Sequence, residues 1–465
     1  MSQHTESWQR EGYLETHNHH LTVDGVDAIE LVEKFGSPLY VFSEKRIAQN
    51  VRHLRCAIEA VHPRIKLCYA SKANSNMAIL RTVLNAGGDI EVNSGGELHK
   101  AKLAGFKPDQ IIFNGVSKTD AEIRDAIDYG ILSINVDSLY ELDQVARVAR
   151  TLNKKANVTI RLVPEIATRS HAALQTGLLS SKFGITPAQV ETAFHHALEM
   201  TDAINLVGVH IHVGSQTPDA EPYALAFGEM WDILVDLHKK YNHKLSHINI
   251  GGGLPINYLP DPTHAETIGE NERAMLSARL DPESVFRAAI NEAVKHDEVG
   301  LLKDLTIVLE PGRKIIGDTG LVLTRICNIK ERPEIGDTWL LTDAGYSLML
   351  SMGMYKWYYH LISASHADEA HAREFKVAGP LCDSGDVYFD IEKGTRLPAY
   401  RRLPESTTVG DVLALLNTGA YALDQSSQYN GRPRPAVVLI RQNGEATIAR
   451  RREVYEDLYA YDVWE

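Results

Sequence analysis

The sequence has few cysteines and no long apolar run, and each absence excludes a class of protein. The four cysteines show no paired spacing, which argues against a disulfide framework or a zinc site. No stretch of about 18 apolar residues is present that could cross a bilayer. The N-terminal residues lack the basic-then-apolar order of a secretory signal. We therefore expect a cytoplasmic globular protein with reduced thiols.

An excess of positive charge is also lacking. The formal net charge is −13, which argues against nucleic acid or an anionic membrane as a partner. Three histidines, His17, His19 and His20, stand close together, but no carboxylate or cysteine has matching metal-ligand spacing. We expect a solvated loop there and no metal site. The 465 residues allow two or three domains, or fewer if one is a large α/β barrel.

Short apolar runs separated by helix-length segments are the main pattern that is present. Several runs pass through turn residues into amphipathic sequence, as 132–136 does, which predicts strands alternating with helices. Eight such strands, several nearly continuous in apolar character, predict a parallel sheet closed as a (β/α)8 barrel. The runs are 65–70, 89–93, 111–114, 132–136, 157–163, 206–213, 247–250 and 306–310.

A second, mostly β domain is expected after the barrel. From about residue 321 the runs become strand-like and are separated by Gly, Pro and Asp turns. We assign 36–320 to the barrel and 1–35 with 321–465 to the β domain. The polar stretch 254–280 is too long for a tight loop, and we expect a lid or a surface excursion there.

Chemistry-bearing residues stand at the ends of the predicted strands, where the active site of such a barrel lies. Lys72 follows the first strand, His212 and Ser215 close the sixth, and three glycines, 251–253, follow the seventh. The run 310–313, Glu-Pro-Gly-Arg, closes the eighth. An amine, a carboxylate, a flat ring and a glycine-lined anion site together predict pyridoxal phosphate as cofactor.

These residues resemble the fold-type III pyridoxal-phosphate decarboxylases, which include diaminopimelate, ornithine and arginine decarboxylases. The resemblance covers nearly the whole chain and implies the alanine racemase-like fold III. It implies that Lys72 is the Schiff-base lysine, that His212 stacks on the ring, and that Glu310 pairs with the pyridine nitrogen. The phosphate binders that it implies are Ser215, Gly251, Gly252 and Gly253, and the Glu-Pro-Gly-Arg signature adds Gly312 and Arg313 as cofactor-binding residues.

Motifs of the second domain extend the resemblance. The segment 379–386, with Cys382 and Asp383, looks like the part of the family that enters the partner subunit's active site. By this likeness Cys382 protonates the reaction's carbanion, Asp383 contacts the distal amine of the substrate, and a homodimer shares its active sites. Tyr421, in Gly-Ala-Tyr, resembles the tyrosine that reaches cofactor and substrate, and Arg313 is a further substrate contact.

The substrate implied by the likeness is a basic diamino acid. Diaminopimelate decarboxylases usually carry Glu where this chain has Asp383, and an arginine beyond Asp-Ala-Gly that is missing after Gly345. We therefore expect decarboxylation of lysine or ornithine, including the D-enantiomer, to a diamine. The alternatives are meso-diaminopimelate, for which Arg169 would replace the missing arginine, and a siderophore-type or carrier-bound amino acid.

Two other functions stay open at this point. A racemase would use the same cofactor and a related barrel, but it needs two bases, and product analysis separates it from a decarboxylase. A non-catalytic protein that descended from a decarboxylase and regulates a partner would lack cofactor absorbance. The joint presence of Lys72, Glu310, Arg313 and Cys382 argues against that second function.

Overall fold

The computed structural model describes residues 7–165, 177, 179–392 and 395–464. The chain forms two compact units, which we call the barrel unit and the β unit. The barrel unit consists of Ala48–Ile256 and Ala278–Ile315. The β unit consists of Met1–Ile47, Asn257–Ser277 and Ile316–Glu465. No helix among the described residues is long and apolar enough to span a membrane.

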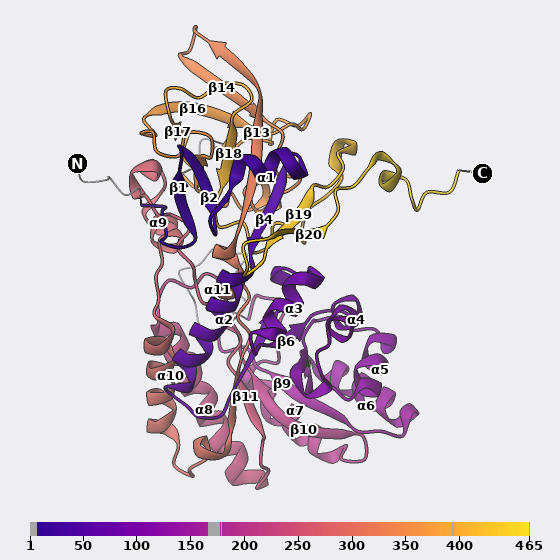
Figure 1. Ribbon diagram of the computed structural model, residues 1–465. Coiled ribbons are helices and arrows are strands. Elements are labelled where there is room, and N and C mark those ends of the chain that lie inside the picture. Colours follow the sequence, from indigo (N-terminus) through magenta and orange to yellow (C-terminus); the bar gives the residue numbers. More distant parts are fainter. Residues whose placement is uncertain (1–6, 166–176, 178, 393–394, 465) are drawn as a thin grey trace. The chain divides into compact units, whose positions relative to one another are not determined.

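Eight parallel strands of the described barrel unit close into a barrel, in the order β10-β11-β12-β5-β6-β7-β8-β9 (Figure 1). Each strand lies within or overlaps one predicted run, so the predicted fold class is confirmed. The strands are almost wholly buried, which explains why several of them are nearly continuous in apolar character. Their bounds are β5 Ile65–Ala70, β6 Asp89–Val92, β7 Ile111–Phe113, β8 Ser133–Val136, β9 Ala156–Arg161, β10 Ile204–His210, β11 His247–Asn249 and β12 Thr306–Leu309.

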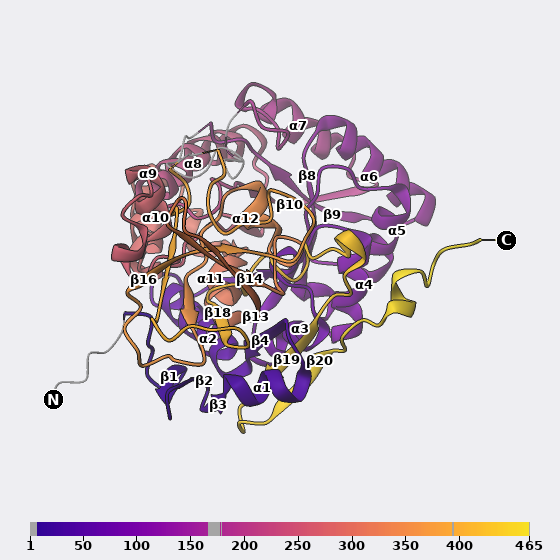
Figure 2. The same cartoon turned by 90° about the horizontal axis from the view of Figure 1, so that it is seen from above.

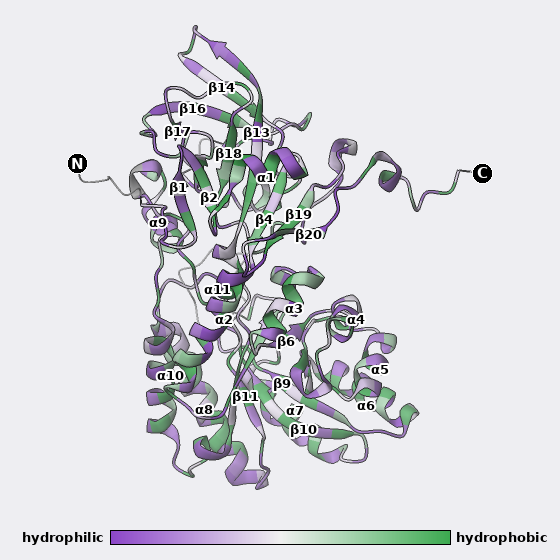
Figure 3. Cartoon of the chain, viewed as in Figure 1, coloured by the Kyte–Doolittle hydropathy of each residue, from purple (hydrophilic) through white to green (hydrophobic). Residues whose placement is uncertain are grey.

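Helices surround these strands (Figure 2). Their capping residues explain where several of them begin, because the hydroxyl oxygens of Ser94, Thr119 and Ser138 accept backbone N–H groups of the first turn. Figure 3 shows both polar and apolar stretches along these helices. The helices are α2 Glu44–Glu59, which continues across the unit boundary, α3 Met77–Asn85, α4 Gly95–Ala104, α5 Asp120–Tyr129, α6 Leu139–Leu152, α7 Pro187–Glu199, α8 Glu221–Tyr241, α10 Pro282–His296 and α11 Arg313–Ile316.

The β unit is built on a sheet whose main path is β17-β16-β14-β13-β4-β19-β20, with β18 pairing to β13 and β15. A second, small sheet, β1-β2-β3, turns between β1 and β2 at Asn18 and His19, so His17 and His20 lie in strands and not in the loop expected there. The strands are β1 Leu14–His17, β2 His20–Val23, β3 Val26–Asp27, β4 Leu39–Ser43, β13 Gly320–Arg332, β14 Asp337–Thr342, β15 Leu361–Ser363, β16 Arg373–Ala378, β17 Arg401–Leu403, β18 Val412–Leu415, β19 Ala436–Ile440 and β20 Ala446–Arg450. The helices are α1 Ala28–Phe35, α9 Glu270–Leu276 and α12 Leu350–Met354.

Two segments differ from the expected division. The strand β4 lies inside the range 36–320 that we assigned to the barrel, yet it pairs with β13 and β19 of the β unit. The stretch 257–277 is no surface excursion, because Tyr258 is fully buried and its ring centroid lies 5.1 Å from that of Trp357. Aromatic packing therefore makes this stretch part of the β unit.

Candidate active site

Two loops of the barrel unit pack closely around Lys72. The strand β5 ends in a single 3-10 turn, Ser71–Ala73, whose Lys72 side chain is exposed. The backbone N–H of Ala70 donates to the carbonyl of Pro311 at 3.2 Å, which ties this turn to the loop after β12. A Cβ at Gly312 would lie 3.0 Å from the Cβ of Ala73, so a larger residue would push the loops apart. Lys72 thus stands beside the Glu-Pro-Gly-Arg loop.

The three glycines after β11 form a loop that has no room for side chains. A Cβ at Gly252 would lie 2.2 Å from the carbonyl oxygen of Glu310, and a Cβ at Gly253 would lie 2.2 Å from that of Gly214. Gly251 and Gly253 also have positive φ angles, 69° and 99°, which favour glycine. Glycine is therefore required here for close approach of backbone segments.

A hydroxyl and a guanidinium complete the anion-binding groups near this loop. Arg313 begins α11, is 7% exposed, and its Nη2 donates to the Ser215 hydroxyl at 3.4 Å. Ser215 belongs to the loop after β10, next to Gly214, which contacts Gly253. A guanidinium, a hydroxyl and a glycine loop are the groups that proteins use to hold phosphate.

Glu310 is a buried carboxylate that stays ionised. Burial raises its pKa. The effects of His210, Asn249 and His212 lower the pKa by more than burial raises it, and the resulting pKa is about 2. The amide of Asn249 donates to Oε1 at 2.6 Å, and the amide of Asn114 donates to Oε2 at 2.9 Å. His210 Nε2 lies 3.3 Å from Oε2. The charge of Glu310 is thus held in place from three strands.

The ring of His212 is neutral. Burial, reinforced by the positive charges of Lys72 and Arg161, holds its pKa well below the ordinary value. Its Nδ1 accepts the backbone N–H of Gly252 at 3.1 Å, which places the ring proton on Nε2. A neutral, flat ring fixed at the glycine loop is suited to stacking on an aromatic ligand.

A second buried carboxylate, Glu91 at the end of β6, was missed by the sequence analysis. The Asn114 amide that bonds Glu310 also donates to Glu91 Oε1 at 2.8 Å, so one amide links both carboxylates. Burial, with a smaller contribution from Glu310, raises the Glu91 pKa to about 7, although Lys72 opposes the shift. Glu91, Asn114 and Asn249 are polar residues at strand ends, and that position is the signal that would have found them.

The remaining predicted residues lie in the β unit. Cys382 is exposed, and its backbone N–H donates to Asn430 Oδ1 at 2.6 Å. Asp383 Oδ2 accepts the hydroxyls of Tyr346 at 2.8 Å and Tyr429 at 3.4 Å. A backbone bond from Gly385 and the bond from Tyr346 lower the Asp383 pKa, so this side chain is an anion. Cys382 and Asp383 therefore stand on an ordered segment.

Tyr421 is held by an unusual backbone in the β unit. Its φ is 63°, in the left-handed region that is costly for a tyrosine. Two residues earlier, a Cβ at Gly419 would lie 1.8 Å from the carbonyl oxygen of Ile316, so only glycine fits. The Gly-Ala-Tyr motif is thus a strained turn. Arg169, the other predicted substrate residue, lies outside the described residues.

Comparisons with known proteins agree with this geometry. The model of the pyridoxal-binding domain of pyridoxal-dependent decarboxylases matches residues 45–317. A diaminopimelate decarboxylase of Methanothermobacter thermautotrophicus is 36% identical over 441 residues, 94% of each chain. The M. jannaschii diaminopimelate decarboxylase in complex with L-lysine has a TM-score of 0.84 and 34% identity, covering 97% of this chain and 98% of that one.

A second kind of relative is more distant. The lysine/ornithine decarboxylase of Vibrio vulnificus complexed with putrescine has a TM-score of 0.70 and 25% identity, covering 90% of this chain and 97% of that one. Both kinds are decarboxylases by name, and both match along nearly the whole chain. The chain therefore belongs to the pyridoxal-dependent decarboxylase family, and its cofactor is pyridoxal phosphate.

Proposed function

We propose that the protein removes one carboxylate of meso-diaminopimelate and so produces L-lysine and carbon dioxide. The observation that supports this substrate is the extent of the likeness to diaminopimelate decarboxylases, 36% identity over 94% of the chain. The M. jannaschii structure also has a higher TM-score than the lysine/ornithine decarboxylase, 0.84 against 0.70. Lysine or ornithine is the substrate expected from the sequence, and meso-diaminopimelate, the alternative, is the better supported substrate.

The groups on the barrel rim fit pyridoxal phosphate. The glycine loop, the Ser215 hydroxyl and the Arg313 guanidinium match the phosphate, and the Lys72 amine matches the aldehyde. When bound, this cofactor supplies an electron sink for the electron pair that carbon dioxide leaves behind. In our proposal Glu310, ionised at any pH near neutrality, keeps the pyridine nitrogen protonated, and His212 stacks on the ring.

The β unit supplies the proton and the contact to the distal end of the substrate. The Cys382 thiol gives a proton to the Cα atom, where it replaces the lost carboxylate. The Asp383 carboxylate pairs with the distal ammonium group, which diaminopimelate shares with lysine and ornithine. Tyr421 contacts cofactor and substrate. Since Cys382 is exposed on its own unit, we propose that it acts in a partner copy, within a two-fold dimer.

A comparison of kcat/KM among candidate substrates tests the proposed function. The kcat/KM values of meso-diaminopimelate, D- and L-lysine, and D- and L-ornithine are measured under one set of conditions. We expect diaminopimelate to be preferred by at least tenfold, which corresponds to about 1.4 kcal/mol of transition-state binding. An equal or higher value for lysine or ornithine would refute the proposed substrate. Product analysis gives L-lysine if the enzyme is a decarboxylase, and a stereoisomer of the substrate if it is a racemase.

Lysine or ornithine remains the second candidate substrate, and one observation favours it. Asp383 offers its carboxylate to the distal ammonium group of every candidate, so the discriminating observation is an absent cation. No arginine follows Gly345 in the run 346–355 that would pair with a second carboxylate. An unpaired carboxylate in a dry site costs several kcal/mol. The same kcat/KM series decides between the two candidates.

A further inference from the structure

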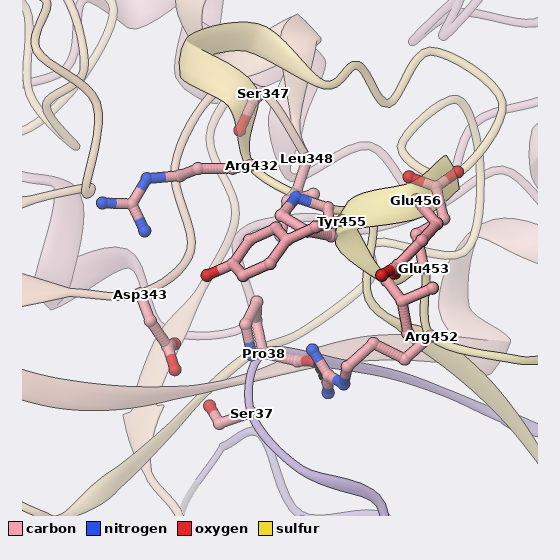
Figure 4. A pocket seen from close by; sticks show the side chains of 12 residues that line it. Ser37, Pro38, Asp343, Ser347, Leu348, Arg432, Arg452, Glu453, Tyr455 and Glu456 are labelled. Carbon is pink, nitrogen blue, oxygen red and sulfur yellow. Dashed lines mark hydrogen bonds between the residues drawn. The ribbon is translucent and has the colours of Figure 1, made fainter. Parts of the chain in front are cut away.

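A cavity of about 440 Å³ lies in the β unit (Figure 4). Its volume is within the roughly 300–1,000 Å³ that is usual for small-molecule sites. Four segments of the chain form it: the loop before β4, the loop after β14, the residues before β19 and the residues after β20. None of the predicted site residues lines it. The charged and polar residues used below are Asp343, Ser347, Arg432, Arg452, Tyr455 and Glu456.

Two guanidinium groups on its walls form no close ion pair among the described residues. The nearby Arg434 and Arg451 pair with Glu453 and Asp457. Within the described residues, by contrast, neither Arg432 nor Arg452 has a carboxylate within ion-pair distance. Arg452 is half-buried, and its guanidinium donates to the carbonyl oxygens of Phe35 and Pro38, at 3.2 and 2.7 Å. The charge of Asp343, which lines the same cavity, acts on Arg452 without an ion-pair contact, so the half-buried guanidinium can still bind an anionic group.

Other walls offer an acceptor and a neutral hydrogen-bonding group. Asp343 Oδ1 accepts the Thr324 hydroxyl at 2.7 Å and the Arg325 N–H at 2.9 Å, which leaves its second oxygen for a ligand. Ser347 is 4% exposed, and Figure 4 shows its hydroxyl pointing into the cavity. No hydrogen bond of that hydroxyl occurs among the described residues. The cavity thus combines positive and negative groups around one space.

We propose that this cavity is a second binding site, for a free α-amino acid with a cationic side chain. The α-carboxylate pairs with Arg452 and Arg432, and the α-ammonium group pairs with Asp343. The ring of Tyr455, which lies across the cavity in Figure 4, covers the aliphatic part of the side chain. The exposed Glu456 takes the terminal ammonium at the rim.

The site is connected to the segment that carries Cys382. Arg432 Nη2 donates to the carbonyl oxygen of Pro380 at 2.9 Å. Ser347 follows Tyr346, whose hydroxyl bonds Asp383. A ligand that shifts Arg432 or Ser347 therefore shifts the neighbours of Cys382 and Asp383. If the proposed function holds, the ligand is L-lysine, the product, and its binding here lowers turnover.

Binding of L-lysine to the full-length holoenzyme tests the proposal. Calorimetry should count one fewer lysine per chain for Arg452→Gln than for the wild type. Arg451→Gln is the matched control, because Arg451 pairs with Asp457 instead of lining the cavity, and it should bind as the wild type does. Added L-lysine should lower the kcat of the wild type at least twofold and leave the kcat of Arg452→Gln unchanged.

A second variant covers the case in which Arg452→Gln does not fold. Tyr455 is 73% exposed, so Tyr455→Ala keeps the fold and should weaken lysine binding at this site at least threefold. Equal lysine counts and affinities in the variants and the wild type would overturn the proposal. Inorganic phosphate that displaces the lysine at equal concentration would also overturn it, because a simple anion site would then explain the binding. Turnover of diaminopimelate without added lysine, measured on the same samples, tests the proposed function separately.

Discussion

The barrel rim and the segment 379–386 of the β unit differ in the exposure of their chemically important side chains. On the rim, Glu310 and Glu91 are buried, and amides of the same unit hold them in place. On the segment, Cys382 is exposed although its backbone is fixed by Asn430. The rim therefore has the buried, fixed charges that a cofactor site needs, whereas the segment presents its thiol to solvent. Damage to the two regions should have different consequences.

The largest effect should come from Lys72→Ala. Without the amine, no covalent bond to the cofactor can form, and both covalent loading and activity should disappear. The measurement is borohydride reduction followed by mass spectrometry. Lys102→Ala, which changes a surface lysine that pairs with Asp125, is the control and should keep its loading. Cofactor attached to Lys72→Ala at a level near that of the wild type would show that Lys72 is not the attachment site.

Cys382→Ala should leave cofactor loading intact and slow the chemical step. Loss of a general acid costs typically 10²–10⁴ in rate, so we expect kcat to fall by about that factor. The exposed Cys327 of the same unit provides the control Cys327→Ala, which should retain activity. The loading and kcat of all three proteins are compared. A Cys382→Ala enzyme with normal kcat would remove this residue from the mechanism.

Glu91 should make the cofactor-free protein sensitive to pH. Its folded-state pKa of about 7 lies above the ordinary 4.5, so the folded protein binds this proton more tightly than the unfolded chain. The resulting contribution to the free energy of unfolding is fully present below about pH 4.5 and is lost as the pH rises from there through about 7. At about 1.4 kcal/mol per pKa unit, the loss amounts to about 3 kcal/mol.

Glu91→Gln replaces the carboxylate with a neutral group of the same shape and should lack this pH dependence. Urea unfolding of both proteins at pH 5 and pH 8 measures it. The stability of the variant relative to the wild type should increase toward pH 8. Parallel curves for the two proteins would mean that Glu91 is ionised across the whole range.

The smallest expected effect concerns the distal contact. Asp383→Asn removes the negative charge and should lower kcat/KM for the diamino acid by about tenfold, with unchanged cofactor loading. Asp390→Asn, which changes a carboxylate on the chain beyond this segment, is the matched control. Equal losses in the two variants would show that Asp383 has no special contact with the substrate.

The sequence was sufficient for the barrel because burial on both faces makes each strand an apolar run, and glycines and charges at the strand ends indicated the rim. The sequence was not sufficient to predict the hydrogen bonds by which Asn114 links Glu91 and Glu310. Glu91 and Asn114 are polar residues in or beside partly apolar runs, and only the closed barrel brings them together with Glu310. Neither residue has a neighbour in sequence that reveals this contact.

Long-range packing explains the other difference. The stretch 257–277 is polar in sequence, and its place in the β unit depends on Tyr258 meeting Trp357, about 100 residues later. The strand β4 likewise gains its partners from β13 and β19, which come late in the chain. A local pattern contains no information on such pairings.

Complementation between two inactive variants tests the central claim most directly. Lys72→Ala lacks a working rim, and Cys382→Ala lacks a working segment, so neither is active alone. If each rim is completed by the segment of the partner copy, random mixing gives hybrid dimers with one intact site, and activity should return to about one quarter of the wild-type value. Activity of the mixture that stays at the sum of the two parents would contradict the shared active site.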